Sequence, residues 1–199
     1  MKLERLVLAT ANAGKARELR TLVAKWGAVE VLSLADVAPL AMPAETAATY
    51  LANALLKARA VCAATGLPAL ADDSGLEVDA LGGAPGVHSA RYAPSDAAAN
   101  ARLLAALCDV PALARTARYR AVVAVAWPDG AVLTAEGVCE GRIAEAPRGS
   151  GGFGYDPLFV SADLGKTCGE ASAEEKAGIS HRARAMAALG RALHHRGIV

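Results

Sequence analysis

The residues of this chain that could do chemistry gather in four short stretches. The first is Thr10-Ala11-Asn12-Ala13-Gly14-Lys15, which stands where an apolar run ends and a helical pattern begins. The amide groups and the dipole at a helix start attract anions, and the Lys15 ammonium adds positive charge. Ala16 follows the lysine, whereas a Walker A loop requires Ser or Thr there. The stretch therefore fits either a different kind of anion site or an ordinary turn in which Asn12 caps the helix.

The second stretch, Ala71-Asp72-Asp73-Ser74-Gly75, places two acids side by side after a short apolar run. Two carboxylates at the end of a buried strand repel each other unless a cation or hydrogen-bond donors share them. Mg²⁺ fits such a place because it prefers hard oxygen ligands and usually keeps water and substrate phosphates as its other ligands. The alternative is a turn with solvated acids. Ala71 and Leu76 indicate a half-buried setting, which favours the metal.

The third stretch is Gly151-Gly152-Phe153-Gly154-Tyr155-Asp156-Pro157. Its glycines allow the backbone to approach a ligand closely, and its aromatic rings offer faces for a flat ring. Asp156 can accept hydrogen bonds from a base edge or a sugar. The alternative is a mobile surface loop, which fits poorly with two aromatic residues in a chain that has only 4% of them.

The fourth stretch combines Lys176 with Ser180-His181-Arg182. The positive charges of Lys176 and Arg182 lie at or near predicted helix starts, where they oppose the helix dipole. Sequences depart from such local preferences where function requires it, so an anion or a carbonyl-bearing base is one explanation. A solvated, charged helix end is the other.

Three single positions are candidates as well. Lys57 stands on an amphipathic helical pattern, where a lysine is usually solvated. Arg91 follows a rigid Gly-Pro loop and can reach either a phosphate or a neighbouring acid. Glu45 precedes a helix, which it can cap, or it can hold a metal.

Apolar periodicity indicates the elements that carry these stretches. Helices are predicted over residues 14–26, 49–64 and 95–107, and two more follow the capping residues Ser172 and Ser180. Strands are predicted over residues 6–10 and 29–32, as two short strands about a turn at 73–75, and as a hairpin of 119–127 with 131–138. The predicted buried faces are Leu51, Ala54, Leu55, Ala58 and Cys62 in the second helix, and Ala183, Met186, Ala187 and Leu193 in the last. This order predicts an α/β fold, a central mixed, twisted sheet flanked by helices in one domain over residues 1–199.

Composition limits the partners and the compartment. The net charge of +1 gives no global basic field for nucleic acid or an anionic membrane, and 54% hydrophobic residues suffice for a packed core. The four cysteines form no CxxC pair, which favours free, buried thiols in a reducing cytoplasm. No apolar run is long enough to span a bilayer.

The chain resembles the inosine triphosphatase family. The matching stretches are LATANAGKARELR, LPALADDSGLEVDALGGAPGVHSARYA, GGFGYDPLF and EEKAGISHR, in the family's order. The resemblance implies two lobes with the active-site cleft between them, a homodimer, and Mg²⁺-dependent hydrolysis of non-standard purine nucleoside triphosphates. These substrates, ITP, dITP and XTP, would give the monophosphate and pyrophosphate, which cleanses the nucleotide pool.

The resemblance also implies roles for single residues. Asp73 is the catalytic residue and a metal ligand, with Glu45 and Asp72 as further metal ligands. The substrate-binding residues are Thr10 to Lys15, Lys57, Ser74, Arg91, Phe153, Gly154, Tyr155, Asp156, Lys176, His181 and Arg182. The chain departs from the family where it reads Ala44-Glu45-Thr46-Ala47 in place of the common EETG.

The implied reaction is attack of water on the α-phosphorus, for which a protein mainly supplies positioning and charge neutralisation. Asp73 either orients and deprotonates the water or serves only as a metal ligand. Donors from Lys176, His181 or Arg182 would favour a carbonyl at position 6 of the purine over the amino group of adenine. Two alternatives are a Maf-like nucleotide pyrophosphatase with another base preference and a non-catalytic nucleotide-binding protein.

Overall fold

The computed structural model describes residues 2–37 and 40–199. The strands form one six-stranded sheet in the order β2-β1-β3-β4-β5-β6. Strand β1 pairs in parallel with β2 and β3, and β5 pairs antiparallel with β6, so the sheet is mixed. The strands are β1 (Arg5–Leu8), β2 (Glu30–Leu32), β3 (Ala69–Val78), β4 (Thr116–Ala126), β5 (Val132–Ile143) and β6 (Phe159–Ser161). The predicted α/β class with a mixed sheet flanked by helices is confirmed.

Local capping signals determine where the helices begin. Asn12, Thr49 and Ser95 each accept a hydrogen bond from a backbone amide three residues on, and Ser172 forms a capping box with Glu175. The helices are α1 (Ala13–Val23), α2 (Tyr50–Thr65), α3 (Asp96–Ala106), α4 (Ala173–Ile179) and α5 (His181–His195), joined by short 3₁₀ helices. All five helices were predicted, within a few residues of these bounds.

The chain divides into two compact units. The first unit runs to Asp73 and adds the segments Ala121–Gly137 and Arg182–Val199, while the second unit comprises Ser74–Arg120 and Val138–His181. Strands β3, β4 and β5 contribute residues to both units. The prediction of a single domain stays a prediction, and each unit is described by itself below.

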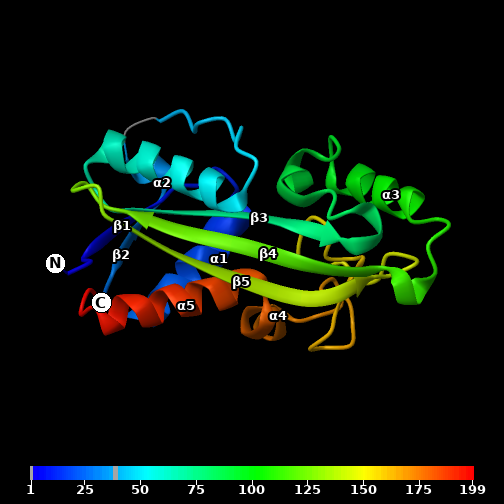
Figure 1. Cartoon of the computed structure of the whole chain (residues 1–199). Helices are drawn as coiled ribbons and strands as arrows, with labels where there is room; N and C mark the ends of the chain where they lie inside the picture. Colours follow the sequence, from blue (N-terminus) through cyan, green and yellow to red (C-terminus); the bar gives the residue numbers. More distant parts are fainter. Residues whose placement is uncertain (1, 38–39) are drawn as a thin grey trace. The chain divides into compact units, whose positions relative to one another are not determined.

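In the first unit, helices cover both faces of the sheet. Figure 1 shows α2 on one face of β1 and β3, and α1 with α5 on the other. The core on the α1 and α5 side is built from aliphatic residues of both helices and of the strands, among them Leu6, Leu19, Val123, Met186 and Leu189. The ends of the described chain meet here, because the Leu3 amide donates to the Ile198 carbonyl at 2.8 Å.

The second unit has its own core. Residues of β3, α3, β4, β5 and β6 contribute to it, among them Leu76, Leu103, Tyr119, Ile143 and Phe159. The glycine-rich stretch lies beside this core and contains no regular element over residues 150–156, as predicted. Strand β6 directly after that stretch was not predicted, because three residues are too few for a periodic signal.

One prediction for the strands was wrong, and the predicted face of α2 was right only in part. Residues 70–80 contain one continuous strand, not two strands about a turn, and the backbone stays extended through Gly75. On α2, Ala54, Ala58 and Cys62 are buried as predicted, but Leu51 is 44% exposed, and the buried face also includes Asn53 and Lys57. In both places buried polar groups find partners from distant parts of the chain, which a local pattern does not reveal.

The predictions for the last helix and the cysteines are confirmed except at Ala187 and Cys108, which are exposed. On α5, Ala183, Met186 and Leu193 are buried as predicted, but Ala187 is exposed and Leu189 takes its place. The four cysteines are free thiols as predicted, and three of them are buried, whereas Cys108 is exposed. Within residues 2–37 and 40–199, no helix is both long enough and apolar enough to cross a bilayer.

Candidate active site

The junction of β1 and α1 carries the first predicted stretch. The Asn12 side chain accepts a hydrogen bond from the Lys15 amide at 3.0 Å, and the Asn12 amide donates to Thr10 Oγ1 at 3.2 Å. The interpretation of Asn12 as a helix cap is confirmed. No acidic residue stands in the first turn of α1 as described, so the helix start keeps its positive potential. Anion binding by Thr10 to Lys15 stays a prediction.

Asp72, on β3, is buried among positive charges. Its Oδ2 accepts hydrogen bonds from Arg182 at 3.0 Å, and its Oδ1 lies 3.4 Å from Lys15 Nζ. Arg182 Nη1 also contacts Glu18 of α1. Burial alone would raise the pKa of Asp72, but Arg182, Lys15 and Lys57 hold it well below its ordinary value. Asp72 therefore remains ionised and holds both cations in place.

Asp73, the next residue, shares a lysine with Glu45. Lys57 Nζ donates to Glu45 Oε1 at 2.6 Å, to the Asp72 carbonyl at 2.7 Å and to Asp73 Oδ1 at 3.3 Å. On its other side, Asp73 Oδ2 accepts from Asn53 Nδ2 at 3.1 Å. The ammonium of Lys57 thus bridges two carboxylates from different segments. We call Lys15, Glu45, Lys57, Asp72 and Asp73 the acid–lysine cluster.

Burial and charge shift the pKa values in this cluster in different directions. Burial and the nearby Glu45 raise the pKa of Asp73, even though Lys57 opposes the rise. Burial lowers the pKa of Lys15, with only partial compensation from Asp72. Burial would lower the pKa of Lys57 too, but Asp73 and Glu45 raise it above its ordinary value. A carboxyl group whose pKa is raised accepts a proton more readily, which suits a group that takes a proton from water.

The acid–lysine cluster fits a divalent metal ion in part. Asp73 and Glu45 already share one cation, and Asp72 Oδ1 is buried without a hydrogen bond from any described residue. In the part of the chain that the structure describes, no three His, Cys, Asp or Glu side chains converge as a preformed metal site. Mg²⁺ is commonly bound through one or two carboxylates together with substrate phosphates, so two carboxylates suffice for an ion that binds with its substrate.

The glycine-rich stretch and α4 form a second group of predicted residues, in the second unit. Asp156 Oδ2 accepts from the Phe153 amide at 2.9 Å and from Lys176 Nζ at 2.5 Å. The same Lys176 ammonium lies 4.8 Å from the centre of the Phe153 ring, a cation–π distance. His181 is buried and stacks on Tyr119, whose hydroxyl donates to Asp156. We call Phe153, Asp156, Lys176 and His181 the aromatic cluster.

The glycines of this stretch serve packing inside the protein. A Cβ at Gly152, where φ is +76°, would lie 2.0 Å from Asp156 Oδ2, and one at Gly149 would lie 2.2 Å from the Gly169 backbone. Neither position tolerates a side chain without displacing these atoms. The amide of Gly154 donates to Asp96 Oδ2 at 2.7 Å, which fixes the stretch to α3. The glycines therefore let the stretch fold tightly around Asp156.

Several predicted residues have surroundings that the sequence did not reveal. Tyr155 is buried, and its hydroxyl donates to the Ser89 carbonyl at 3.0 Å, so its ring packs in the core. Arg91 is exposed at the end of a 3₁₀ helix, and Ser74 is half-buried on β3. Arg182 belongs to the first unit with Asp72, whereas its sequence neighbour His181 belongs to the second. The positive charge of Arg182 near a helix start is thus balanced by carboxylates.

Sequence reasoning missed three residues. Asn53 holds Asp73, Glu18 holds Arg182, and Tyr119 stacks on His181 with ring centroids 4.8 Å apart. Asn53 lies outside the predicted apolar stripe of its helix, so the pattern gave no signal of its burial. Glu18 and Tyr119 gave none, because their partners are distant in the sequence.

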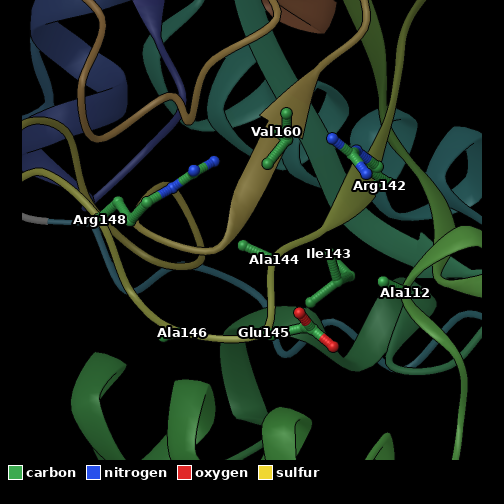
Figure 2. Close-up of a pocket in the computed structure, with 8 residues that line it drawn as sticks. All are labelled: Ala112, Arg142, Ile143, Ala144, Glu145, Ala146, Arg148 and Val160. Atoms are coloured by element: carbon green, nitrogen blue, oxygen red, sulfur yellow. The ribbon is translucent and has the colours of Figure 1, made fainter.

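A separate pocket of 270 Å³ lies elsewhere in the second unit. Figure 2 shows its lining side chains, with Arg142 and Glu145 among them. Its lining is Ala112, Arg142, Ile143, Ala144, Glu145, Ala146, Arg148 and Val160. None of these belongs to the predicted site, so we assign the pocket no part in it.

The fold and the two clusters define a class of α/β protein, one that carries buried lysine–carboxylate pairs in one unit and a glycine–aromatic stretch with its own lysine–carboxylate pair in the other. The chain belongs to the Ham1 family, whose model matches residues 6–192. The resemblance predicted from the sequence is thereby confirmed.

Relatives and solved structures agree on this family. The dITP/XTP pyrophosphatase of Symbiobacterium thermophilum is 57% identical over 94% of this chain and 93% of its own length. That of Thermus thermophilus is 55% identical over 93% of this chain and 89% of its own. A HAM1 protein structure from Coxiella burnetii superposes with a TM-score of 0.88 at 38% identity, covering 96% of this chain and 99% of the other.

Proposed function

We propose that this chain is a nucleoside triphosphate pyrophosphatase, which hydrolyses the non-standard purine nucleotides ITP, dITP and XTP to the monophosphate and pyrophosphate. Two relatives that are 57% and 55% identical to it are named for the dITP/XTP activity. The observation that carries the proposal is the acid–lysine cluster, in which Lys57 Nζ bridges Glu45 and Asp73. A buried cation between carboxylates is an arrangement suited to phosphoryl chemistry, where charge neutralisation is the main task.

The first step is binding of the triphosphate. The start of α1 offers backbone amides and a positive dipole, and Lys15 stands in its first turn. Burial lowers the pKa of Lys15, so an anion placed beside it would stabilise the charged form of its ammonium. Lys57 adds a second ammonium. These groups hold the phosphate oxygens and offset their charge.

Mg²⁺ completes the proposed site. Asp73 and Glu45 would hold the ion, with the buried Asp72 Oδ1 as a further oxygen nearby. When bound, Mg²⁺ neutralises phosphate charge and polarises the phosphorus–oxygen bonds. The Lys57 ammonium, which lies between Glu45 and Asp73, would add positive charge beside the same phosphates.

Asp73 is the proposed catalytic residue. Its fixed position between Lys57 and Asn53 fits a carboxylate that holds the ion and orients the attacking water, whose proton passes to solvent. The water adds to the α-phosphorus, and the bond from that phosphorus to the bridging oxygen breaks. Pyrophosphate leaves with the electron pair of that bond.

The aromatic cluster is proposed to read the base. Phe153 offers a ring face, and Lys176, fixed by Asp156 at 2.5 Å, offers a donor beside it. A donor favours hypoxanthine and xanthine, which carry a carbonyl at position 6, over adenine, which carries an amino group. His181 and Arg182 were predicted as further donors; of the two, Arg182 contacts Asp72 and Glu18.

The oligomeric state and the compartment of the enzyme are part of the proposed function. We propose a homodimer in the cytoplasm with no nucleic-acid or membrane partner, supported by the net charge of +1 and by free cysteines typical of a reducing compartment. Light scattering of the purified protein reports its mass. A monomeric mass at enzyme concentrations used in assays would rule out the dimer.

A panel of triphosphates tests the function. Steady-state kcat/KM is measured for ITP, dITP, XTP, GTP and ATP, with and without Mg²⁺, by release of pyrophosphate. We expect Mg²⁺-dependent turnover with the first three substrates well above the last two. Tight ITP binding without turnover would instead identify a nucleotide-binding protein, and preference for another base would favour a Maf-like activity.

A further inference from the structure

Tyr119 occupies a central place beside the aromatic cluster. It lies on β4 and is 9% exposed. Its ring stacks on His181 with an angle of 16° between the planes and packs at 49° against Phe159, with centroids 4.5 Å apart. Its hydroxyl donates to Asp156 Oδ1 at 3.5 Å. One side chain therefore touches two members of the cluster.

The Tyr119 hydroxyl donates to one oxygen of the Asp156 carboxylate, and two other donors reach the second oxygen. Oxygen Oδ2 of Asp156 accepts from the Phe153 amide and from Lys176, whereas Oδ1 accepts from Tyr119. A carboxylate held on both oxygens is less free to rotate than one held on a single oxygen. Because Asp156 also fixes Lys176, rotation of the carboxylate would move the ammonium beside the Phe153 ring.

Packing alone does not explain the hydroxyl. The neighbours of Tyr119 in this core are largely apolar, and a phenylalanine would fill the ring's space equally well. A buried hydroxyl is unfavourable unless it forms a hydrogen bond. Burial and the charge of Asp156 raise the pKa of Tyr119 well above its ordinary value, so the hydroxyl keeps its proton and acts as a donor.

We propose that Tyr119 is a positioning residue for base recognition, which holds Asp156 through its hydroxyl and His181 through its ring, and so sets the affinity for the purine. This inference rests on the proposed function of the aromatic cluster. It assigns Tyr119 no contact with the phosphates, so its effect should be confined to ligands that carry a base.

The test compares a ligand that has a base with one that does not. Binding of IMP and of inorganic tripolyphosphate is measured by calorimetry for wild type, Tyr119→Phe and Tyr119→Leu, together with KM and kcat for ITP. Tyr119→Phe loses only a long hydrogen bond. We therefore expect the Kd for IMP and the KM for ITP each to rise by about two- to fivefold. Tripolyphosphate binding and kcat should stay within a factor of about two. Tyr119→Leu also loses the stacking on His181, so its IMP binding should be weaker still.

A matched control and a double variant separate positioning from general damage. Thr116 lies on the same strand, and its hydroxyl donates to Asp79 Oδ2 at 2.7 Å outside the cluster. Thr116→Val removes a comparable hydroxyl–carboxylate bond and should leave IMP binding unchanged. If Tyr119 acts through Asp156, Tyr119→Phe should have no further effect in an Asp156→Asn background.

The remaining outcomes distinguish an error in the role of Tyr119 from an error in the proposed function. Unchanged IMP binding in Tyr119→Phe, parallel weakening of tripolyphosphate, or additive effects with Asp156→Asn would overturn the role of Tyr119. A wild-type protein that binds IMP but does not hydrolyse ITP would overturn the proposed function and leave the Tyr119 comparison intact. A wild type that neither hydrolyses ITP nor binds IMP would overturn both.

Discussion

Lys57 holds two acidic side chains together, and its removal should be costly in a specific way. The side chain is 7% exposed, and its ammonium lies 2.6 Å from Glu45 Oε1 and 3.3 Å from Asp73 Oδ1. Lys57→Met keeps most of the aliphatic stem and removes the charge. The variant therefore leaves two carboxylates facing each other without their shared cation.

The size of the effect follows from burial. Breaking a buried ion pair by removing one partner costs ~3–5 kcal/mol. The Glu45 side chain is 25% exposed, so water offsets part of this loss, and we expect about 2–4 kcal/mol. For a chain of 199 residues each kcal/mol lowers Tm by roughly 2–4 °C, so Tm should fall by about 5–15 °C.

Thermal unfolding of the wild type and Lys57→Met, with and without millimolar Mg²⁺, measures this effect. We expect Mg²⁺ to raise Tm more in the variant, because the ion can replace the missing ammonium between the carboxylates. The control is Lys166→Met, whose ammonium lies 2.8 Å from Glu175 but whose pair is exposed, so its Tm should not change. A Lys57→Met protein that melts within about 1 °C of wild type would refute the reasoning. So would a deficit that Mg²⁺ leaves unchanged.

Three further predictions concern single residues. Asp73→Asn should lower kcat for ITP by about a hundredfold or more while circular dichroism shows an intact fold, and wild-type rates would remove Asp73 from catalysis. Arg182 and Lys15 hold the folded pKa of Asp72 well below 3.8 against the effect of burial, so its carboxylate stabilises the fold above pH 3.8 and loses that contribution as pH falls through the folded value. Urea unfolding of Asp72→Asn should therefore show lower stability at neutral pH and a flatter decline below pH 3.8 than wild type; equal slopes would contradict this. Gly152→Ala places a Cβ 2.0 Å from Asp156 Oδ2 and should raise KM for ITP, whereas Gly178→Ala, with open space around it, should not.

Features that depend on neighbours in the sequence could be predicted. Asn12 as the cap of α1 and the capping box of Ser172 with Glu175 follow from residues three positions apart. The family could be predicted because its motifs are short and occur in a fixed order. The α/β class followed from the alternation of strand and helix patterns.

Features that depend on distant partners could not be predicted. The Asp73-Ser74-Gly75 stretch reads as a turn, yet it continues β3, where Asp72 is held by Arg182 from 110 positions away. The predicted face of α2 included Leu51, which is exposed, and left out Lys57, which is buried because Glu45 and Asp73 neutralise it. Charge pairs between distant segments override local preference and cannot be read from periodicity.

Contacts between residues distant in the sequence could not be predicted in the candidate site either. The sequence predicted which residue types carry the chemistry, and the predicted roles of Asp73 and Glu45 stay predictions. It did not indicate that Lys57 lies between these two, nor that Tyr119 reaches Asp156. These arrangements arise only when strands and helices far apart in the chain pack together.

The fate of labelled oxygen tests the central claim most directly. ITP is hydrolysed with Mg²⁺ in water enriched in ¹⁸O, and the products are separated and weighed by mass spectrometry. Attack on the α-phosphorus at the acid–lysine cluster predicts one ¹⁸O atom in IMP and none in pyrophosphate, and loss of both products in Asp73→Asn. Label in pyrophosphate, or release of inorganic phosphate in its place, would contradict the account.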